Sequence, residues 1–177
     1  GKSSMADIQI RHSQLTENGM LLSLAHGDAH FEIPLPLTGL HNSWNAAAAM
    51  TVAFACGVSL DEAALGLSTV LPPSGRLYHR VLPQTQLTLL DDTYNANPES
   101  MEMGLNTLMA TAGQRHIAVL GEMLELGEYA ESAHRSLGAA VAQKRVDAVF
   151  CCGELSQFYV EGATAEGLSA QKIFWAP

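Results

Sequence analysis

LTLLDDTYNANPESM, residues 87–101, decides the fold of this 177-residue chain. The apolar run 87–90 predicts a buried strand. Asn97, Pro98 and Glu99 predict a helix start, with an Asn cap, a proline at the first helical position and an acid near the positive end of the helix dipole. The same order recurs downstream, with strands expected at 117–120, 148–151 and 173–175 and helices at 98–112, 129–144 and 154–165. Apolar strands that alternate with helices predict an α/β fold with a mostly parallel, helix-covered sheet.

The residues upstream follow a different pattern. Between 6 and 37, apolar and polar residues alternate with a period of two, which predicts strands. Turn residues at Asn18-Gly19 and His26-Gly27-Asp28 divide this stretch into a small antiparallel β-meander. Pro34 and Pro36 indicate that its last strand lies at a sheet edge or is already leaving the sheet, because proline has no N–H to donate to a neighbouring strand.

Two helices and a linker follow the meander. The first helix is expected at 41–56, and the second begins after Ser59, which has the capping-box spacing to Glu62. The prolines in Leu71-Pro72-Pro73-Ser74-Gly75 exclude a helix and stiffen the connection. We therefore expect two domains, 1–72 and 73–177, with a hinge at 72–75.

The composition excludes several classes of protein. Apolar residues make up 47% of the chain, and eighteen acids against nine Lys and Arg give a net charge of −9, which disfavours nucleic acid as a partner. No stretch approaches the roughly 20 apolar residues of a membrane span, and no signal peptide is evident, so we expect a cytoplasmic protein without membrane insertion. Cys56, Cys151 and Cys152 are expected to be buried apolar residues, not disulfide partners or zinc ligands.

Polar segments after the predicted strands are the candidate sites, because ligands of open α/β sheets bind at the carboxyl ends of strands. The segment 91–98 offers Asp92 to hydroxyl groups and free helix amides to anions. The segment 121–127 carries Glu122 and Glu125 between two glycines. His41 and Asn45 lie four residues apart, on one helix face. Each segment is also compatible with an ordinary capped helix start or a turn with solvated acids.

One apparent motif is excluded. Gly1-Lys2-Ser3-Ser4 is similar to the end of a GxxxxGK[ST] phosphate loop, but the first glycine is missing and a strand pattern follows. Such a loop needs the amides of a helix N-terminus. Since no GxGxxG follows any strand either, a free-standing dinucleotide-binding module is also disfavoured.

Taken in order, the polar segments resemble one family. They are His41-Asn42-x-x-Asn45, Pro73-Ser74-Gly75-Arg76, residues 91–101 and residues 118–127, with His134 in the next helix. They resemble the Mur ligase family, which shares HNxxN and the GR step with folylpolyglutamate synthases. DDTYNANP with G[DE]MLELG is the form of the branch that adds D-alanyl-D-alanine; Glu122 stands where that branch more often has Asp. The resemblance carries motifs from Gly39 to Gly127 and extends more loosely over the whole chain.

The resemblance implies a three-domain parent protein: a UDP-sugar-binding domain, a central ATPase domain and a Rossmann-like C-terminal domain. Residues 1–72 would be the C-terminal portion of the central domain, whose end is the β-meander and two helices. Residues 73–177 would be most of the C-terminal domain, incomplete at its C-terminal end. The family's phosphate loop, magnesium ligands and carbamylated lysine have no counterpart in this sequence.

The resemblance also implies a reaction that uses ATP and Mg²⁺. ATP would phosphorylate the terminal carboxylate of UDP-N-acetylmuramoyl-tripeptide, and the amine of D-alanyl-D-alanine would attack the acyl phosphate. Nucleotide contacts would come from Asn45 to adenine, Arg76 to the phosphates and Asp92 to the ribose, with His41 orienting the helix start; Arg76 would also be catalytic. Substrate contacts would come from Tyr94, Asn95, Asn97 and Glu122.

Two alternatives stay open. The polypeptide by itself could be a non-catalytic folded or nucleotide-binding module, active only within a longer chain. A related ligase acting on another amino acid or on folate is the second, which the loop 92–98 would distinguish. In the ligase interpretation we expect a monomer.

Overall fold

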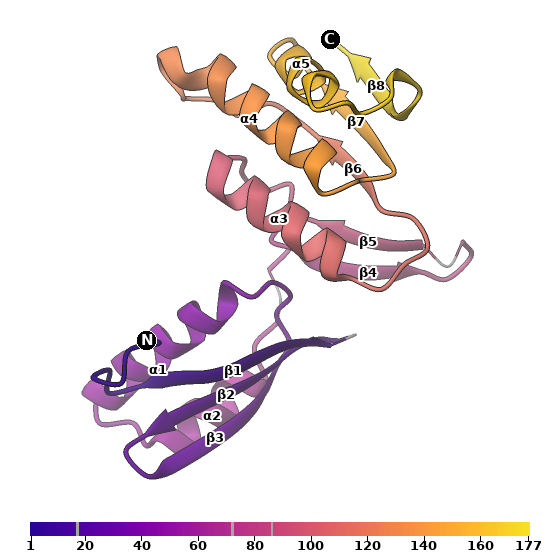
Figure 1. The fold of residues 1–177 in the computed structure, drawn as a ribbon. Helices are drawn as coiled ribbons and strands as arrows, with labels where there is room; N and C mark the ends of the chain where they lie inside the picture. The colour runs from indigo at the N-terminus through magenta and orange to yellow at the C-terminus, as the bar shows by residue number, and fades with distance from the viewer. Residues whose placement is uncertain (17, 72, 86) are drawn as a thin grey trace. The chain divides into compact units, whose positions relative to one another are not determined.

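The computed structural model describes residues 1–16, 18–71, 73–85 and 87–177, which form two compact units, Gly1–Asp92 and Thr93–Pro177 (Figure 1). The division between these compact units falls after Asp92, since residues 78–91 group with the first unit. Pro72, the first residue of the expected hinge, lies outside the described residues.

The first unit begins with the predicted meander. Strands β1 (Gln9–Thr16), β2 (Gly19–His26) and β3 (Ala29–Leu35) pair antiparallel in that order. Gly27 takes the left-handed conformation, with φ of 56°, in the turn between β2 and β3. The strand that contains Pro34 lies at the edge of this sheet, as its proline predicts.

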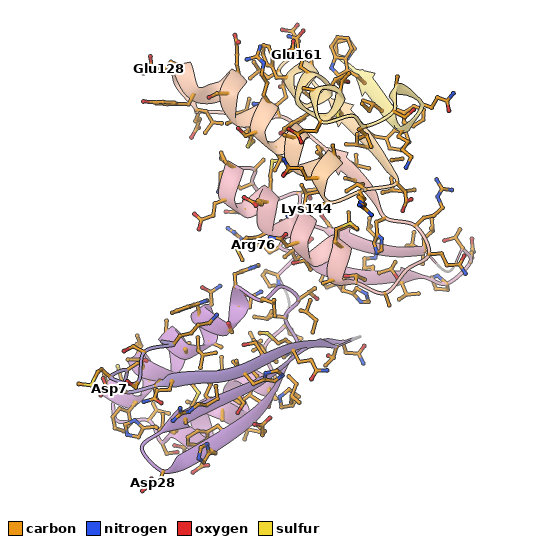
Figure 2. All side chains as sticks on the ribbon, in the orientation of Figure 1. Asp7, Asp28, Arg76, Glu128, Lys144 and Glu161 are labelled. Carbon is orange, nitrogen blue, oxygen red and sulfur yellow. The ribbon has the colours of Figure 1, made fainter. Side chains whose placement is uncertain are left out.

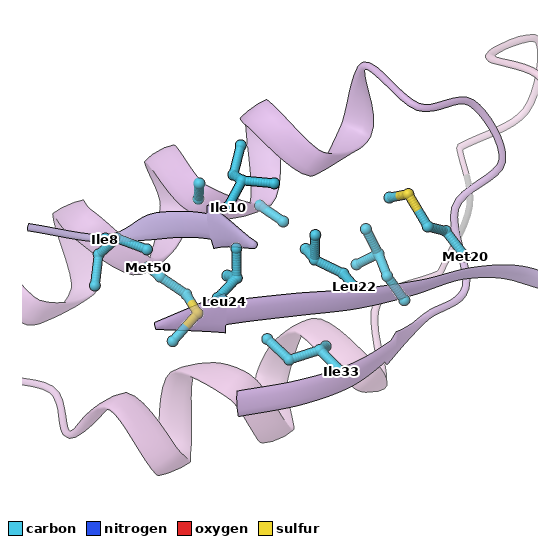
Figure 3. Packing of buried hydrophobic residues seen from close by; sticks show 10 residues of the cluster. Ile8, Ile10, Met20, Leu22, Leu24, Ile33 and Met50 are labelled. Carbon is cyan, nitrogen blue, oxygen red and sulfur yellow. The ribbon is translucent and has the colours of Figure 1, made fainter. Parts of the chain in front are cut away.

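Two helices cover one face of the meander. Helix α1 (Asn42–Ala55) has no charged residue, and its inner face is made of small residues and Met50. Figure 3 shows Met50 packed with the inward side chains of the three strands, among them Leu22, Leu24 and Ile33, all at most 1% exposed. Full burial of each such side chain stabilises the fold by about 1.5–3 kcal/mol.

Helix α2 (Leu60–Ser68) begins with the capping box that the sequence predicts. The Ser59 hydroxyl oxygen accepts a hydrogen bond from the Glu62 amide at 3.3 Å, and the Glu62 carboxylate accepts from the Ser59 hydroxyl at 2.6 Å. The Ser59 amide also donates to the Glu62 carboxylate at 3.3 Å, so both amides, which the first turn of a helix leaves without intrahelical partners, are satisfied.

A β-hairpin completes the first unit and corrects the prediction for residues 87–90. The strand β5 (Leu87–Asp91) was expected in a parallel sheet, but it pairs antiparallel with β4 (Tyr78–Leu82). The sequence did not predict β4 because His79 and Arg80 interrupt its apolar pattern. Both strands are largely exposed or half-buried, so no continuous apolar run marks them as a pair.

The second unit contains the predicted parallel sheet. Strands β6 (Ile117–Leu120), β7 (Ala148–Cys152) and β8 (Ile173–Ala176) pair parallel in that order. The helices of this unit are α3 (Pro98–Ala110), α4 (Ala130–Gln143) and α5 (Gln157–Ala165), with short 3₁₀ turns at Gly127–Tyr129 and Ala170–Lys172. A second core forms here, with Val141, Val149 and Tyr159 at most 1% exposed. Parallel strands with helical crossovers are the predicted α/β architecture.

Helices α4 and α5 approach each other at two glycines. A Cβ atom placed on Gly138 would lie 2.1 Å from the carbonyl oxygen of Tyr159, and one on Gly162 would lie 2.0 Å from that of Arg135. Each glycine therefore accommodates the backbone of the other helix. At the surface, Arg135 forms ion pairs with Glu131 and with Glu161 of α5, which is labelled in Figure 2.

The cysteines depart from expectation. All three are free thiols, but only Cys151 is buried, whereas Cys56 and Cys152 are exposed. Cys56 caps the C-terminus of α1 at the surface. Cys152 follows Cys151 in β7, and successive strand residues point to opposite faces. In the ranges described, every helix is too short or too polar to cross a lipid bilayer.

Candidate functional site

Two of the predicted nucleotide residues, His41 and Arg76, lie near enough to influence Asp92, which directly follows β5. Its Oδ1 atom accepts a hydrogen bond from the Leu77 amide at 3.0 Å. Burial raises the pKa of Asp92, while the Leu77 bond and the positive charges of His41 and Arg76 act in the opposite direction. The carboxylate is thus half-buried and oriented, with His41 and Arg76 near enough to influence it.

Arg76 is brought to Asp92 by the turn that leads into β4. Gly75 and Leu77, on either side of it, both have positive φ, 71° and 50°. Glycine accepts this conformation readily, but a leucine there costs about 1–3 kcal/mol. The Arg76 side chain is exposed and is labelled in Figure 2. A guanidinium at the surface beside a carboxylate suits an anionic ligand, since it can donate two parallel hydrogen bonds.

His41 lies against Gly39 at the start of α1. A Cβ atom on Gly39 would be 2.6 Å from Cε1 of the His41 ring, so only glycine leaves space for the ring there. His41 makes no side-chain cap to the helix. Its Nδ1 atom is buried and has no hydrogen-bond partner in the part of the chain that the structure describes. Burial lowers the pKa of His41, and the Asp92 carboxylate offsets part of this effect.

Asn45 lies in the first turn of α1 with its amide exposed. Its Nδ2 atom donates to Oδ1 of Asn42 at 2.9 Å, and Asn42 in turn donates to the carbonyl of Thr38 at 2.8 Å. This chain of bonds holds the Asn45 side chain in place at the helix start. An exposed, oriented amide offers both a donor and an acceptor to a ligand.

Three predicted substrate residues belong to the second unit. Tyr94 and Asn95 are exposed in the segment that precedes α3, with Tyr94 69% exposed. Asn97 caps α3: its Oδ1 accepts from the Ser100 amide at 2.9 Å, and its own amide donates to the Ser100 hydroxyl at 3.2 Å. The Asn97 side chain therefore has the structural role that its sequence context predicts.

Glu122 joins the segment after β6 to the segment after β7. Its Oε1 atom accepts from the Leu155 amide at 2.5 Å. Gly153, with φ of 105°, leaves space for the Glu122 side chain, because a Cβ atom there would lie 2.4 Å from its carboxyl carbon. The carboxylate thus stabilises the carboxyl end of the parallel sheet.

Two further buried side chains hold the segment 121–127. The Met123 amide donates to Nε2 of His134 at 3.1 Å, so Nδ1 carries the ring proton and donates to the carbonyl of Ala130 at 2.6 Å. The Tyr159 hydroxyl donates to the carbonyl of Gly121 at 2.9 Å. His134 therefore holds the backbone of the segment 121–127 in place, which explains why a histidine occurs at this point of the motif.

The structure brings His41, Arg76 and Asp92 together and places Asn45 one turn into the same helix as His41. Glu122 and Asn97 bond to other elements of the second unit, Leu155 and Ser100. Sequence reasoning did not find Leu77, because a leucine carries no signal for a positive φ. No group of three or more His, Cys, Asp or Glu in the described ranges could hold a metal ion.

Comparisons with known proteins identify the family of this chain. The family described as "Mur ligase, glutamate ligase domain" matches residues 75–175, more than half of the chain. The chain is 32% identical over 164 residues to the UDP-N-acetylmuramoyl-tripeptide–D-alanyl-D-alanine ligase of Bacillus subtilis, covering 92% of this chain and 35% of that protein. It spans about a third of the length of the curated relatives it matches.

Solved structures give the same result. The crystal structure of MurF from Acinetobacter baumannii matches with a TM-score of 0.85 and 29% identity, over 98% of this chain and 36% of that one. The MurF ligase from Thermotoga maritima in complex with ADP matches with a TM-score of 0.80 at 24% identity, over 99% of this chain and 38% of that one. This second match shows a similar fold. Family match, relatives and fold together establish that this chain belongs to the Mur ligase family.

Proposed function

We propose that this chain is part of an ATP-dependent ligase of peptidoglycan precursor synthesis, which adds D-alanyl-D-alanine to UDP-N-acetylmuramoyl-tripeptide through an acyl phosphate. The observation that carries the proposal is the cluster of His41, Arg76 and Asp92, in a chain related to ligases of that name. Residues 1–72 correspond to the C-terminal portion of the central ATPase domain and 73–177 to the C-terminal domain, incomplete at its end.

The residues of the first unit are assigned to the nucleotide. The Asp92 carboxylate accepts hydrogen bonds from the ribose hydroxyls, and the Asn45 amide donates to and accepts from the adenine edge. Arg76 contacts the phosphates and, as the catalytic residue, offsets the negative charge that develops during phosphoryl and acyl transfer. His41 supports the helix start from which Asn45 projects.

The residues of the second unit are assigned to the substrates. Tyr94 and Asn95 are exposed and can donate hydrogen bonds to the dipeptide or to the acyl phosphate. Asn97 holds the N-terminus of α3 behind them, and Glu122 fixes the neighbouring segment of the same unit. Mg²⁺ would neutralise phosphate charge when bound with ATP, through ligands that this sequence does not contain. We also infer a cytoplasmic monomer.

The isolated chain is proposed to bind nucleotide without turning it over, because its sequence contains no GxxxxGK[ST] phosphate loop. ATP hydrolysis by the purified chain that Arg76→Ala abolishes would contradict this part of the proposal.

Isothermal titration with ATP and magnesium tests the nucleotide assignment. Binding should be lost in Asp92→Ala and in Asn45→Ala. Asp91→Ala is the matched control, since it removes the neighbouring carboxylate at the end of β5 and should retain binding. Equal affinity of all four proteins, or loss in the control alone, would overturn the assignment of Asp92 and Asn45.

A further inference from the structure

Leu77, which bonds to Asp92, has an unusual backbone conformation. Its φ of 50° lies in the left-handed region, which side chains with a Cβ atom rarely adopt. Asn and Asp enter this region because their side chains can bond locally, but leucine has no such compensation. The Leu77 side chain is only 5% exposed, so the conformation is enforced by packing.

Contacts fix this residue on two sides. The side chain packs against the start of α1, where a Cβ atom on Gly39 would lie 2.9 Å from Cδ1 of Leu77. The amide donates to Oδ1 of Asp92 at 3.0 Å. The next residue, Tyr78, pairs with Asp91 in the hairpin. That pairing holds Tyr78, next to Leu77, opposite Asp91, next to Asp92. The φ angle of Leu77 therefore sets the direction of its N–H relative to Asp92.

We propose that Leu77 is a positioning residue whose left-handed backbone, and not the chemistry of its side chain, directs the Asp92 carboxylate toward the ribose hydroxyls of the nucleotide. This inference rests on the proposed function. An ionised carboxylate has about four acceptor positions, so a single bond from Leu77 orients the group and leaves acceptors for a pair of hydroxyls. Arg76 directly precedes Leu77, so the same turn also sets where the guanidinium emerges.

Two substitutions of Leu77 separate backbone from side chain. Leu77→Val keeps an apolar side chain, but a β-branched residue strongly disfavours positive φ. Leu77→Gly removes the side chain but adopts positive φ freely. The measurement is the ratio of the affinities for ATP and for 2′,3′-dideoxy-ATP, which lacks both ribose hydroxyls. Partial unfolding of a variant reduces both affinities by the same factor, so the ratio reports only on the ribose contact.

The wild-type chain should prefer ATP by about tenfold or more, the range expected for hydrogen bonds to a charged group. Leu77→Val should bring the ratio close to one, as should Asp92→Ala, whereas Leu77→Gly should retain the preference. A Val variant with the wild-type ratio, or a Gly variant that loses the preference as fully as Val, would refute the role of Leu77 alone. A wild-type chain without any preference would refute the ribose contact itself, and with it both the proposed nucleotide site and this inference.

Discussion

Replacing Gly138 by alanine should destabilise the second unit, because the added methyl group has no space. The Cβ atom would lie 2.1 Å from the carbonyl oxygen of Tyr159 and 2.8 Å from its carbonyl carbon, against ordinary contact distances of 3.4–4 Å. Both atoms belong to the backbone of α5, so the clash cannot be relieved by a side-chain rotation. Helices α4 and α5 must move apart instead.

The size of the effect follows from two opposing contributions. Alanine in a helix interior is favoured over glycine by about 0.5–1 kcal/mol. Overpacking a close contact costs about 1–3 kcal/mol, and more where backbone must move. We expect a net loss of about 2 kcal/mol, equivalent to a melting temperature lower by about 8–16 °C for a unit of this size. Gly66→Ala in α2 is the control: no atom lies within 4 Å of its Cβ position, so it should stabilise the first unit by up to about 1 kcal/mol.

Native-state hydrogen exchange is the suitable assay, because it measures the free energy of opening separately in each unit. Protection of Val141 and Val149 should fall in Gly138→Ala, while protection of Leu22 and Leu24 should stay at the wild-type level. A Gly138→Ala chain as stable as the wild type would show that the two helix backbones do not approach as closely as the structure has them.

Three further predictions concern single contacts. Ser59→Ala should cost about 1 kcal/mol near neutral pH in urea unfolding. Hydrogen bonds from Ser59 lower the pKa of Glu62, so this stabilisation exists above the unfolded pKa of Glu62 and is lost as the pH falls through the folded pKa. The stability difference between variant and wild type should therefore narrow at low pH, and a difference that stays constant would contradict the prediction. In the folded chain a thiol reagent should modify Cys56 and Cys152, which are exposed. Cys151 should react only after unfolding, because burial raises the pKa of its thiol to about 11. Rapid reaction of all three cysteines would contradict the burial of Cys151. Tyr159→Phe should cost about 1 kcal/mol and speed exchange of the Met123 amide, since the carbonyl of Gly121 loses its donor; unchanged exchange would mean that the bond does not hold the segment.

The sequence predicted the elements whose patterns are local. The capping residues Ser59 and Asn97 marked helix starts correctly, and the strand at Ile117–Leu120 was confirmed to the residue. Strand β4 was missed because an exposed hairpin does not need the apolar alternation that predicts a half-buried strand. Its pairing moved residues 87–90 from the expected parallel sheet into an antiparallel one.

The site was predictable in its side chains but not in its backbone. The family resemblance of the motif segments singled out His41, Arg76 and Asp92, which the structure brings together, although each segment taken by itself was also compatible with a capped helix start or a turn. Leu77 contributes its backbone amide, which every residue except proline carries, so the residue type did not indicate this role. The burial of Cys56 was predicted wrongly because residue type alone does not say on which side of a helix end a side chain lies.

The hairpin of β4 and β5 also bears on how the site assembles during folding. Arg76, Leu77 and Asp92 lie at the two ends of this hairpin, and the bond between Leu77 and Asp92 spans only 15 residues. Closing so short a loop costs little conformational entropy and is fast. His41 and Asn45 come from a segment much earlier in the chain, so their approach requires a longer loop to close. We therefore expect Arg76, Leu77 and Asp92 to come together locally, before the helix that carries His41 and Asn45 is added in a slower step.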